Sequence, residues 1–315
     1  MERKWPCKMT EKIKKQLNIT NALFLVFLLV QLLPERYSKE TYEINIIIFV
    51  VAIQVIYLIF SFVTKKEKKL ETIRDILGIT YFIIIAWQLM TSKSGFLNEL
   101  LFPAPGIVIE QFIHDLPRIL EGIQSSLLII LQGYILAILT AIPLGLAAGW
   151  HIRFGNSFQY VSKFFGSIPP IVYIPYAIAL LPAFRDASVF VIYAASFWPI
   201  LGATMAGVFN IEKKILDSAK TLNVGRFSML FHVMLPAALP EILMGCSQGL
   251  GISFILLTSA EMIGGKTGMG YYIKYYSDFG DFTRIVVGII VLGIVVSVIT
   301  LFFNKLQRYL LRWRQ

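Results

Sequence analysis

The chain has 315 residues, of which 57% are hydrophobic and only 15% are charged, and its mean hydropathy is +0.70. A soluble globular domain is roughly 45–50% apolar and about 25% charged, so the composition excludes that class and indicates an integral membrane protein. The net charge of +10 does not indicate nucleic-acid binding, because Lys and Arg stand in short patches between apolar runs. Two cysteines, Cys7 and Cys246, are too few for a disulfide framework.

Eight segments are apolar enough to cross a membrane, since one helical span needs about 20 mostly apolar residues. They lie at about 18–34, 43–64, 75–92, 119–149, 158–183, 187–209, 240–262 and 285–304. The first is short and follows a basic segment, as in a signal peptide, but no small-residue cleavage site follows it, and we expect a retained helix. The fourth exceeds one span, and we expect its start, "RILEGIQ", to lie along the membrane surface. The sequence predicts an all-α membrane protein of about eight transmembrane helices.

The distribution of Lys and Arg predicts the orientation. With the N-terminus inside and eight alternating spans, most of the 29 Lys and Arg fall on the inner side. They include the patch at 3–15, the segment "TKKEKKLETIR" at 64–74, the segment after the sixth span, and the C-terminal tail. The positive-inside rule therefore predicts a multi-pass protein with both termini in the cytoplasm.

A polar segment at about 211–239, containing "LDSAKTLNVGRFSMLFHVMLP", separates the sixth and seventh predicted spans. Apolar residues recur there at helical spacing in two sets, Ile215, Ala219 and Leu222, then Phe227, Leu230, Phe231 and Met234. Asn223 and Gly225 interrupt the pattern, and both residue types enter the left-handed conformation easily. We expect two short amphipathic helices joined by a sharp turn, with Pro236 ending the second and Pro240 in the first turn of the next span. Patterning alone leaves open a loop lying on the lipid headgroups.

This segment resembles the "EAA" loop of permease subunits of bacterial ABC importers. Asp217, Ser218 and Ala219 stand at the Glu-Ala-Ala positions and Asn223 at the following glycine. The Ile-x-Leu-Pro ending is matched by Val233, Leu235 and Pro236. The departures are Asp for Glu, Ser for Ala and Asn for Gly, and each keeps a similar physical property: a carboxylate, a small side chain and tolerance of positive φ.

The likeness extends over about 75–315. "AWQLM" at 86–90, "LLFPAPGIVIEQF", "SIPPIVYIPYAIALLPAF", "LTSAEMIGGKTGMGYYI" and "LQRYLLRWR" are similar to permeases for sulfonate, taurine, nitrate and bicarbonate. The resemblance implies a type I ABC importer permease domain of six spans at 75–315. Residues 1–74 lie outside it and would form an N-terminal cytoplasmic segment plus two extra transmembrane helices. We expect these helices to face lipid or to pack on the periphery, and the alternative is a docking surface for another protein.

The resemblance also implies how such a protein works. In that family the loop is a coupling helix that docks on a separate ATPase subunit, and the coupling residues would be Asp217, Ser218, Ala219, Leu222, Asn223, Gly225, Phe227, Leu230, Phe231 and Pro236. The implied partners are the ATPase, an extracytoplasmic solute-binding protein, a second copy of the chain and the lipid of a bacterial cell membrane. The chain itself would bind no cofactor, since ATP and Mg²⁺ would belong to the ATPase. We expect Ala219→Arg, or a charge at Phe231, to uncouple transport without unfolding the protein.

The segment "IGGKTG" at 263–268 is similar to a phosphate-binding loop, but Ala260 stands where the first glycine is needed, and the predicted topology puts it outside. Isolated polar residues in the later spans are candidates for the translocation pathway: Gln132, Gln248, Ser253, Thr258 and Glu261. Glu261 is the only carboxylate within a predicted core span; it could gate the pathway or brace helices through a hydrogen bond, and we favour bracing or simple exposure at the interface. Gly145–Gly149 and Gly245–Gly249 are small-xxx-small pairs that predict close helix contacts.

Two other functions fit the sequence less well than an ABC importer permease. A secondary transporter driven by an ion gradient would have broken-helix repeats and charges at mid-membrane, which the sequence does not display. An intramembrane enzyme would need a motif such as HExxH or GxSxG, and neither occurs. For an importer, a small anion such as an aliphatic sulfonate, taurine, nitrate or bicarbonate is the first choice of solute, and a thiamine-precursor-like heterocycle is the alternative.

Overall fold

The computed structural model describes residues 18–35, 40–63, 67–98, 100–150 and 152–314. The basic patch at 3–15, Cys7, Lys65 and Lys66 lie outside the described residues. The described part is helical and contains no strand, which confirms the all-α class. The chain packs as two units, one formed by residues 1–116 and 280–287, the other by 117–279 and 288–315.

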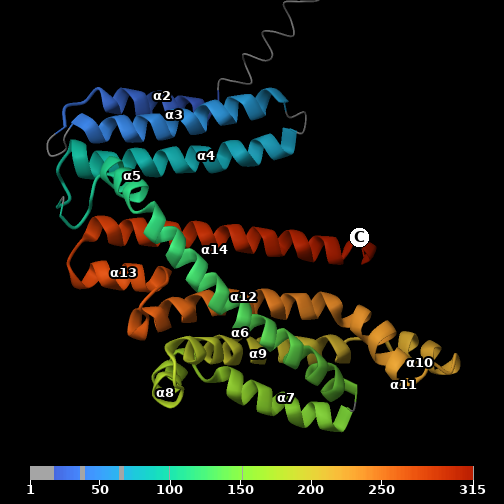
Figure 1. The fold of residues 1–315 in the computed structure, drawn as a ribbon. Coiled ribbons are helices and arrows are strands. Elements are labelled where there is room, and N and C mark those ends of the chain that lie inside the picture. Colours follow the sequence, from blue (N-terminus) through green and yellow to red (C-terminus); the bar gives the residue numbers. More distant parts are fainter. Residues whose placement is uncertain (1–17, 36–39, 64–66, 99, 151, 315) are drawn as a thin grey trace, which may run out of the picture. The chain divides into compact units, whose positions relative to one another are not determined.

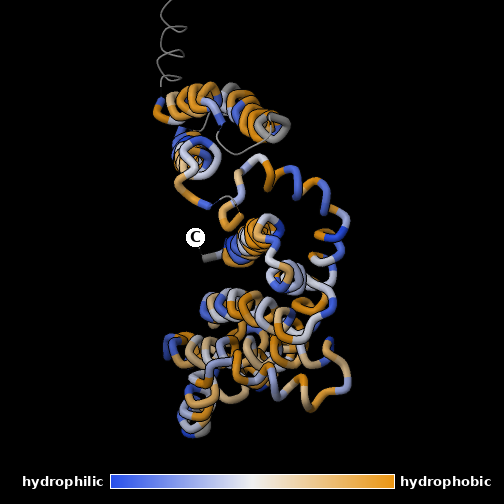
Figure 2. Tube along the Cα trace, turned by 90° about the vertical axis from the view of Figure 1, so that its left-hand side faces the viewer, coloured by the Kyte–Doolittle hydropathy of each residue, from blue (hydrophilic) through white to orange (hydrophobic). Residues whose placement is uncertain are grey.

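Six helices in the described ranges are long and apolar enough to cross a membrane. A bent pair raises the number to seven if it counts as one span, and residues Ile19–Gln31 form a shorter apolar helix. These eight elements correspond to the eight predicted segments. Hydrophobic residues predominate around the long helices, as the orange parts of Figure 2 show, which suits contact with lipid.

The first unit is built from the N-terminal helices, which run side by side in Figure 1. Its elements are α2 (Ile19–Gln31), α3 (Glu40–Val63), α4 (Glu67–Gln88), the π-helical turn η1 (Leu89–Lys93) and α5 (Pro105–His114). Phe27, Val50 and Tyr81 are fully buried between them. The two extra helices therefore pack on α4, which holds the expected first span of the permease.

Polar contacts also join these three helices. Gln54 on α3 donates to the Asn21 amide oxygen on α2 (2.9 Å), and the Tyr81 hydroxyl on α4 donates to Gln54 (3.0 Å). Gln31 and Gln88 exchange two amide hydrogen bonds of 2.8 Å. Since buried polar groups are costly when unpaired, these contacts fix which faces of the helices meet.

The second unit is arranged around α9. Its elements are α6 (Leu116–Trp150), α7 (Ile152–Ser167), the 3₁₀ turn η2 (Pro170–Val172), α8 (Tyr173–Leu180), α9 (Phe184–Phe209), α10 (Lys213–Thr221), α11 (Arg226–Ser228), η3 (Met229–Met234), α12 (Leu235–Gly264), α13 (Met269–Asp278), α14 (Phe282–Leu310) and η4 (Arg312–Arg314), with a few of these residues belonging to the first unit.

Glycines let α6 and α12 approach α9 closely, and the predicted contacts of both glycine pairs are confirmed. A Cβ at Gly145 or Gly149 of α6 would lie 2.6 or 2.7 Å from a Cβ of α9, at Thr204 and Val208 respectively. On α12, Gly245 packs against Ala203 and Gly249 against Ser196. Real Cβ atoms do not approach this closely, so a larger residue at Gly145 or Gly149 would push the helices apart.

Two predicted spans differ from expectation. The segment 158–183 is broken: the helices at Gly155–Ser167 and Pro170–Leu180 are bent by 67°. Pro169 and Pro170 explain the break, because proline has no N–H donor and disfavours a helical residue before it. The predicted surface segment at the start of the fourth span is wrong, since "RILEGIQ" belongs to the continuous 35-residue helix α6.

Candidate functional site

The polar segment between α9 and α12, which we call the wedge (residues 211–239), forms two helical arms joined by a tight turn (Figure 1). Asn223 has φ 51°, the single positive φ among the described non-glycine residues. The N–H of Asn223 donates to the Lys220 carbonyl (2.9 Å) and that of Val224 to the Ala219 carbonyl (3.1 Å). These bonds satisfy carbonyls at the end of α10, so the predicted sharp turn is confirmed. Asn223 adopts the left-handed conformation that glycine usually adopts after a helix.

One face of the wedge is buried in the protein's own core. Ala219, Met229 and Met234 are 7%, 6% and 4% exposed and belong to the core cluster of the second unit. The small Ala219 therefore admits the second arm of the wedge. A large charged residue at 219 would push the arms apart, so the burial of Ala219 argues against the expectation that Ala219→Arg leaves the fold intact.

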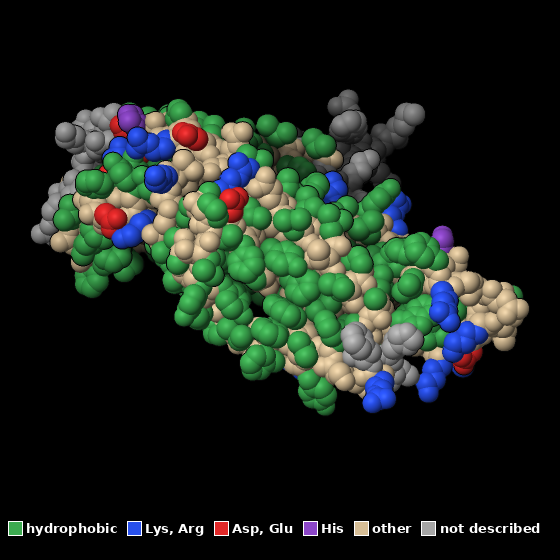
Figure 3. Space-filling view, turned by 60° about the horizontal axis from the view of Figure 1, so that its bottom comes forward, with side chains coloured by type: hydrophobic (Ala, Val, Ile, Leu, Met, Phe, Trp, Pro, Cys, Tyr) green, Lys and Arg blue, Asp and Glu red, His purple; other side chains and the backbone are tan. Residues whose placement is uncertain are grey.

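The other face of the wedge is exposed and apolar at its tip. Leu222 and Phe227 are 77% and 76% exposed, and Phe231 is 44% exposed. The rings of Phe227 and Phe231 lie 4.8 Å apart, so they form one continuous surface. Around this tip stand the exposed cations of the wedge, Lys213, Lys214, Lys220 and Arg226. Figure 3 shows Lys and Arg side chains at the end of the second unit where α10 and α11 lie.

The remaining residues of the implied coupling set lie on α10, at the turn and along the second arm. Asp217 and Ser218 are exposed on α10, and Asp217 accepts a hydrogen bond from Lys220 at 3.3 Å. Gly225 is exposed and begins α11 with φ −63°, so its backbone is not left-handed. Leu230 and Pro236 are half-buried. The exposed members thus present one surface around Leu222 and Phe227.

The prediction that Pro236 ends the second arm is wrong. Helical residues continue from α11 through the π-helical turn η3 into α12, with Pro236 in the first turn of α12 and Pro240 inside the helix. A π turn changes the hydrogen-bond register just before Pro236, where an ordinary α-helix would need the missing N–H. The second arm of the wedge is consequently continuous with a membrane helix.

The pathway candidates do not gather in one place. Gln132 on α6 and Gln248 on α12 are exposed, and Gln132 accepts a 3.4 Å hydrogen bond from Arg185. Thr258 donates to the carbonyl of Phe254 in its own helix (2.8 Å). Ser253 is fully buried, 2.7 Å from the hydroxyl of Ser196 on α9, a residue that sequence reasoning missed.

Glu261 is 1% exposed and its carboxylate joins three segments at the end of α12. One oxygen accepts from the Ser126 hydroxyl of α6 (2.6 Å), and the other accepts from the backbone N–H of Gly270 in α13 (2.7 Å). The Ser126 hydroxyl in turn accepts from the N–H of Met269 (2.9 Å). Gly268, with φ 118°, lies directly against the carboxylate, where a Cβ would collide with it. This geometry is that of a brace.

The helical fold and the apolar spans define the class of this protein as an all-helical, multi-pass membrane protein. The family model described as "Binding-protein-dependent transport system inner membrane component" matches residues 141–315, more than half of the chain. The chain therefore belongs to this family and is a permease subunit of the ABC importer type, rather than an enzyme or an ion-gradient-driven carrier.

The individual relatives are also transport permeases. The chain is 26% identical over 238 residues to the taurine transport system permease protein TauC of Escherichia coli (strain K12), covering 73% of this chain and 86% of that protein. It is 27% identical over 239 residues to the nitrate import permease protein NrtB of Synechocystis sp. (strain PCC 6803), covering 71% and 84%. Its fold is similar to a chain of the inward-facing MetNI methionine ABC transporter, with a TM-score of 0.54, 16% identity, and coverage of 62% of this chain and 97% of that one.

Proposed function

We propose that the wedge couples this permease to a separate ATPase subunit, which hydrolyses ATP with its own bound Mg²⁺. The observation that carries the proposal is the exposed apolar tip of Leu222, Phe227 and Phe231 on an element whose opposite face is locked into the core. An apolar helical tip of this kind fits a groove on a partner protein, as in helix-in-groove recognition.

The wedge is also suited to transmit motion. Its first arm is held through the buried Ala219, and its second arm is held through the buried Met229 and continues into α12 without a break. A displacement of the tip would therefore be passed to a membrane helix as a rigid-body movement instead of being absorbed in a flexible loop.

The exposed cations of the wedge support a cytoplasmic location. Lys213, Lys214 and Lys220 follow the span formed by α9, and cytoplasmic segments are enriched in Lys and Arg. In this orientation both termini lie in the cytoplasm of a bacterial cell. The loop between α12 and α13 then lies outside, where an extracytoplasmic binding protein would deliver the solute.

A second copy of the chain would complete the pathway. On α12, Met244 and Ile255 are 57% and 68% exposed, and between them on the same stripe stand the exposed Gln248 and Gly251. Apart from the adjacent backbone of α12, no atom of the described residues lies within 4 Å of a Cβ built at Gly251, so this stripe can accept a close neighbour. We propose that two copies face each other here and that the solute passes between them, with Gln248 and Gln132 as contact candidates.

The names of the relatives reduce the number of candidate solutes. Their names specify taurine and nitrate, both small molecules that carry an oxyanion group. We propose a small oxyanion, with an organic sulfonate first, for this chain. A thiamine-precursor-like heterocycle stays the second candidate.

Replacing Phe227 with Asp tests the coupling proposal. The transporter is purified from its host through a tag on this chain, and co-purified ATPase activity is measured, a readout that needs no knowledge of the solute. Loss of a central aromatic anchor and burial of a charge should lower the co-purified activity roughly tenfold or more.

Trp313→Asp is the matched control, because Trp313 is a 60% exposed aromatic residue on the same predicted side but outside the wedge. It should retain the activity. Equal ATPase activity in the Phe227→Asp and Trp313→Asp preparations would contradict the proposal.

A further inference from the structure

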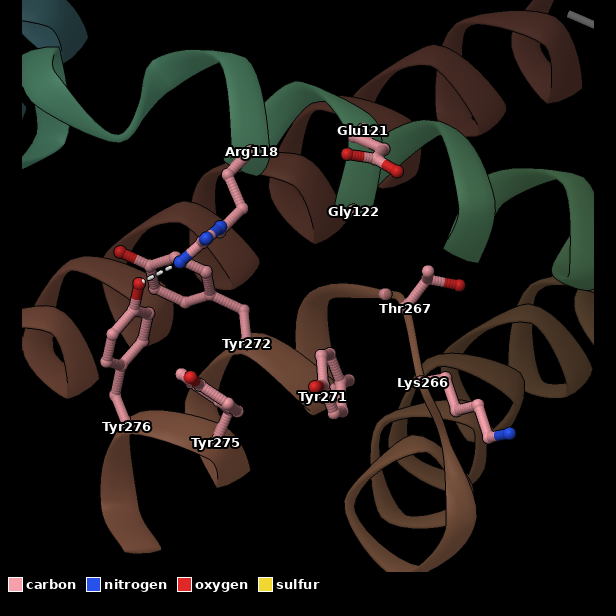
Figure 4. A pocket seen from close by; sticks show the side chains of 10 residues that line it. Arg118, Glu121, Gly122, Lys266, Thr267, Tyr271, Tyr272, Tyr275 and Tyr276 are labelled. Atoms are coloured by element: carbon pink, nitrogen blue, oxygen red, sulfur yellow. Dashed lines mark hydrogen bonds between the residues drawn. The ribbon is translucent and has the colours of Figure 1, made fainter. Parts of the chain in front are cut away.

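A pocket of about 230 Å³ lies at the far end of α12 from the wedge. It is formed by the first turns of α6, the loop after α12, and α13 (Figure 4). The stretch of α12 after the wedge, from Pro240 to Gly264, separates the two by about 38 Å along the helix, at 1.5 Å per residue. With the wedge in the cytoplasm, the pocket opens on the extracytoplasmic side.

Arg118 supplies the charge of this pocket. Its guanidinium reaches from α6 toward α13 and donates to the Tyr276 hydroxyl, as the dashed line in Figure 4 shows. None of the ion pairs among the described residues includes Arg118. A guanidinium has five N–H donors in a planar fork, and the Tyr276 hydroxyl accepts from one of its nitrogens. Arg118 therefore keeps further donors for a ligand in the space between α6 and α13.

Four tyrosines form the wall opposite Arg118. They stand at helical spacing on α13, where they share one face: Tyr271, Tyr272, Tyr275 and Tyr276. The rings of Tyr272 and Tyr276 lie 4.8 Å apart, and those of Tyr275 and Tyr276 lie 5.1 Å apart, both edge to face. Such a wall offers apolar ring surface to a ligand together with hydroxyl groups.

The rim limits the charge of the ligand. Lys266 extends away from Arg118 in Figure 4, so Arg118 is the cation directed at the tyrosines. Glu121, one helical turn after Arg118, also lines the pocket and repels negative charge, so a dianion is disfavoured more strongly than a monoanion. The volume equals roughly seven or eight water molecules at about 30 Å³ each, which leaves more room than a bare inorganic ion fills.

We propose that this pocket is an extracytoplasmic binding site for a small organic monoanion, whose oxyanion group pairs with Arg118 while its apolar stem or ring packs on the tyrosines of α13. The inference rests on the proposed function for its side of the membrane, and it makes the solute class more specific. Among small oxyanions, the pocket favours an organic sulfonate over nitrate or bicarbonate. An inorganic ion can pair with Arg118, but it leaves the tyrosine rings of α13 in contact with water.

Calorimetric titration of the full chain in lipid nanodiscs, without a binding protein, tests the site. The probes are benzenesulfonate, ethanesulfonate, nitrate and sulfate. Benzenesulfonate should bind more tightly than ethanesulfonate, and both more tightly than nitrate or sulfate. No binding of either sulfonate, or equal binding of nitrate, would overturn the proposal.

Variants connect the binding to this pocket. Arg118→Ala should weaken benzenesulfonate binding by roughly ten- to a hundredfold, the usual effect of losing a charge-assisted hydrogen bond. Tyr271→Ala, which removes ring surface and leaves Arg118 in place, should also weaken it and serves if Arg118→Ala fails to fold. Glu121→Gln should strengthen it, because a repelling charge is lost. Lys274→Ala is the matched control, since Lys274 pairs with Asp278 on α13 outside the pocket, and it should leave the affinity unchanged.

Failure of this proposal differs from failure of the coupling proposal. If folded Arg118→Ala and Tyr271→Ala bind benzenesulfonate like the wild type, the site is wrong, whereas co-purified ATPase activity still decides the function. If Arg118→Ala keeps sulfonate binding but no longer associates with a binding protein, Arg118 is a protein contact and the small-ligand proposal is overturned.

Discussion

Glu261 shows how a single carboxylate can hold the C-terminal end of a membrane helix. An isolated charge in this environment would be costly, but both carboxylate oxygens accept hydrogen bonds, from Ser126 and from the backbone of Gly270. Because Ser126 also accepts from Met269, the same few atoms connect α6, α12 and α13. These contacts hold in place the two elements that form the tyrosine-lined pocket.

Gly268→Ala should destabilise the protein. Gly268 has φ 118°, a conformation that L-residues rarely adopt, and its added Cβ would collide with the Glu261 carboxylate. The combined strain and displaced hydrogen bonds should cost about 1–3 kcal/mol. Thermal unfolding in detergent measures this cost against Gly293→Ala, because a Cβ at Gly293 lies more than 4 Å from every described atom outside the adjacent backbone of its own helix. Equal unfolding temperatures for the two variants would contradict the role of this brace.

At the scale of elements, the wedge combines a locked face with an exposed tip. Sequence periodicity predicted its first helix and the turn at Asn223, because apolar spacing and left-handed propensity are local properties. It could not predict that Ala219 is buried while Leu222, on the same stripe, is 77% exposed. That difference arises because α10 ends at Thr221 and the chain turns, so Leu222 leaves the packed face.

Asn223 offers a test of the turn. Asn223→Gly should keep stability and ATPase association, because glycine adopts positive φ without strain. Asn223→Val should lower stability by about 1–2 kcal/mol, because a β-branched residue is strained at φ 51°. Thermal unfolding and co-purified ATPase activity of the two variants are compared. A valine variant as stable as the glycine variant would be inconsistent with the turn described.

Substitutions at two neighbouring positions on α10 distinguish an effect on ATPase docking from an effect on folding. Ser218 is exposed and Ala219 is buried, so arginine at 218 alters the outer surface while arginine at 219 enters the contact with the second arm. Ser218→Arg should leave thermal unfolding within about 0.5 kcal/mol of the wild type and reduce co-purified ATPase activity. Ala219→Arg should lower both, by about 1–3 kcal/mol or more in stability. Equal stability of the two variants would show that Ala219 is not packed as described.

At the scale of the whole molecule, hydropathy was enough to predict the helical class and the segments that became α2 to α4, α6, α9, α12 and α14. It could not predict the 67° bend after Ser167, because apolar content carries no information on the direction of a helix, and the bend depends on Pro169 and Pro170. The continuity across Pro236 depends on a π turn, which has no simple sequence signal.

The two extra N-terminal helices also show that local sequence patterns do not predict contacts between helices. The sequence identified Gln54 as a polar residue within an apolar span, but its partners Asn21 and Tyr81 lie on other helices. Likewise Glu261 was recognised as unusual, while its partner Ser126 is 135 residues away along the chain. Pairings across such separations depend on helix packing, which local patterns do not encode.

A photo-crosslinking amino acid at position 227, introduced in living cells, tests the central claim most directly. If the wedge is the coupling element, irradiation should join this chain to a nucleotide-hydrolysing subunit, and the same substitution at position 313 should give little of that product. Crosslinks from position 227 to lipid alone, or to an extracytoplasmic protein, would contradict the account.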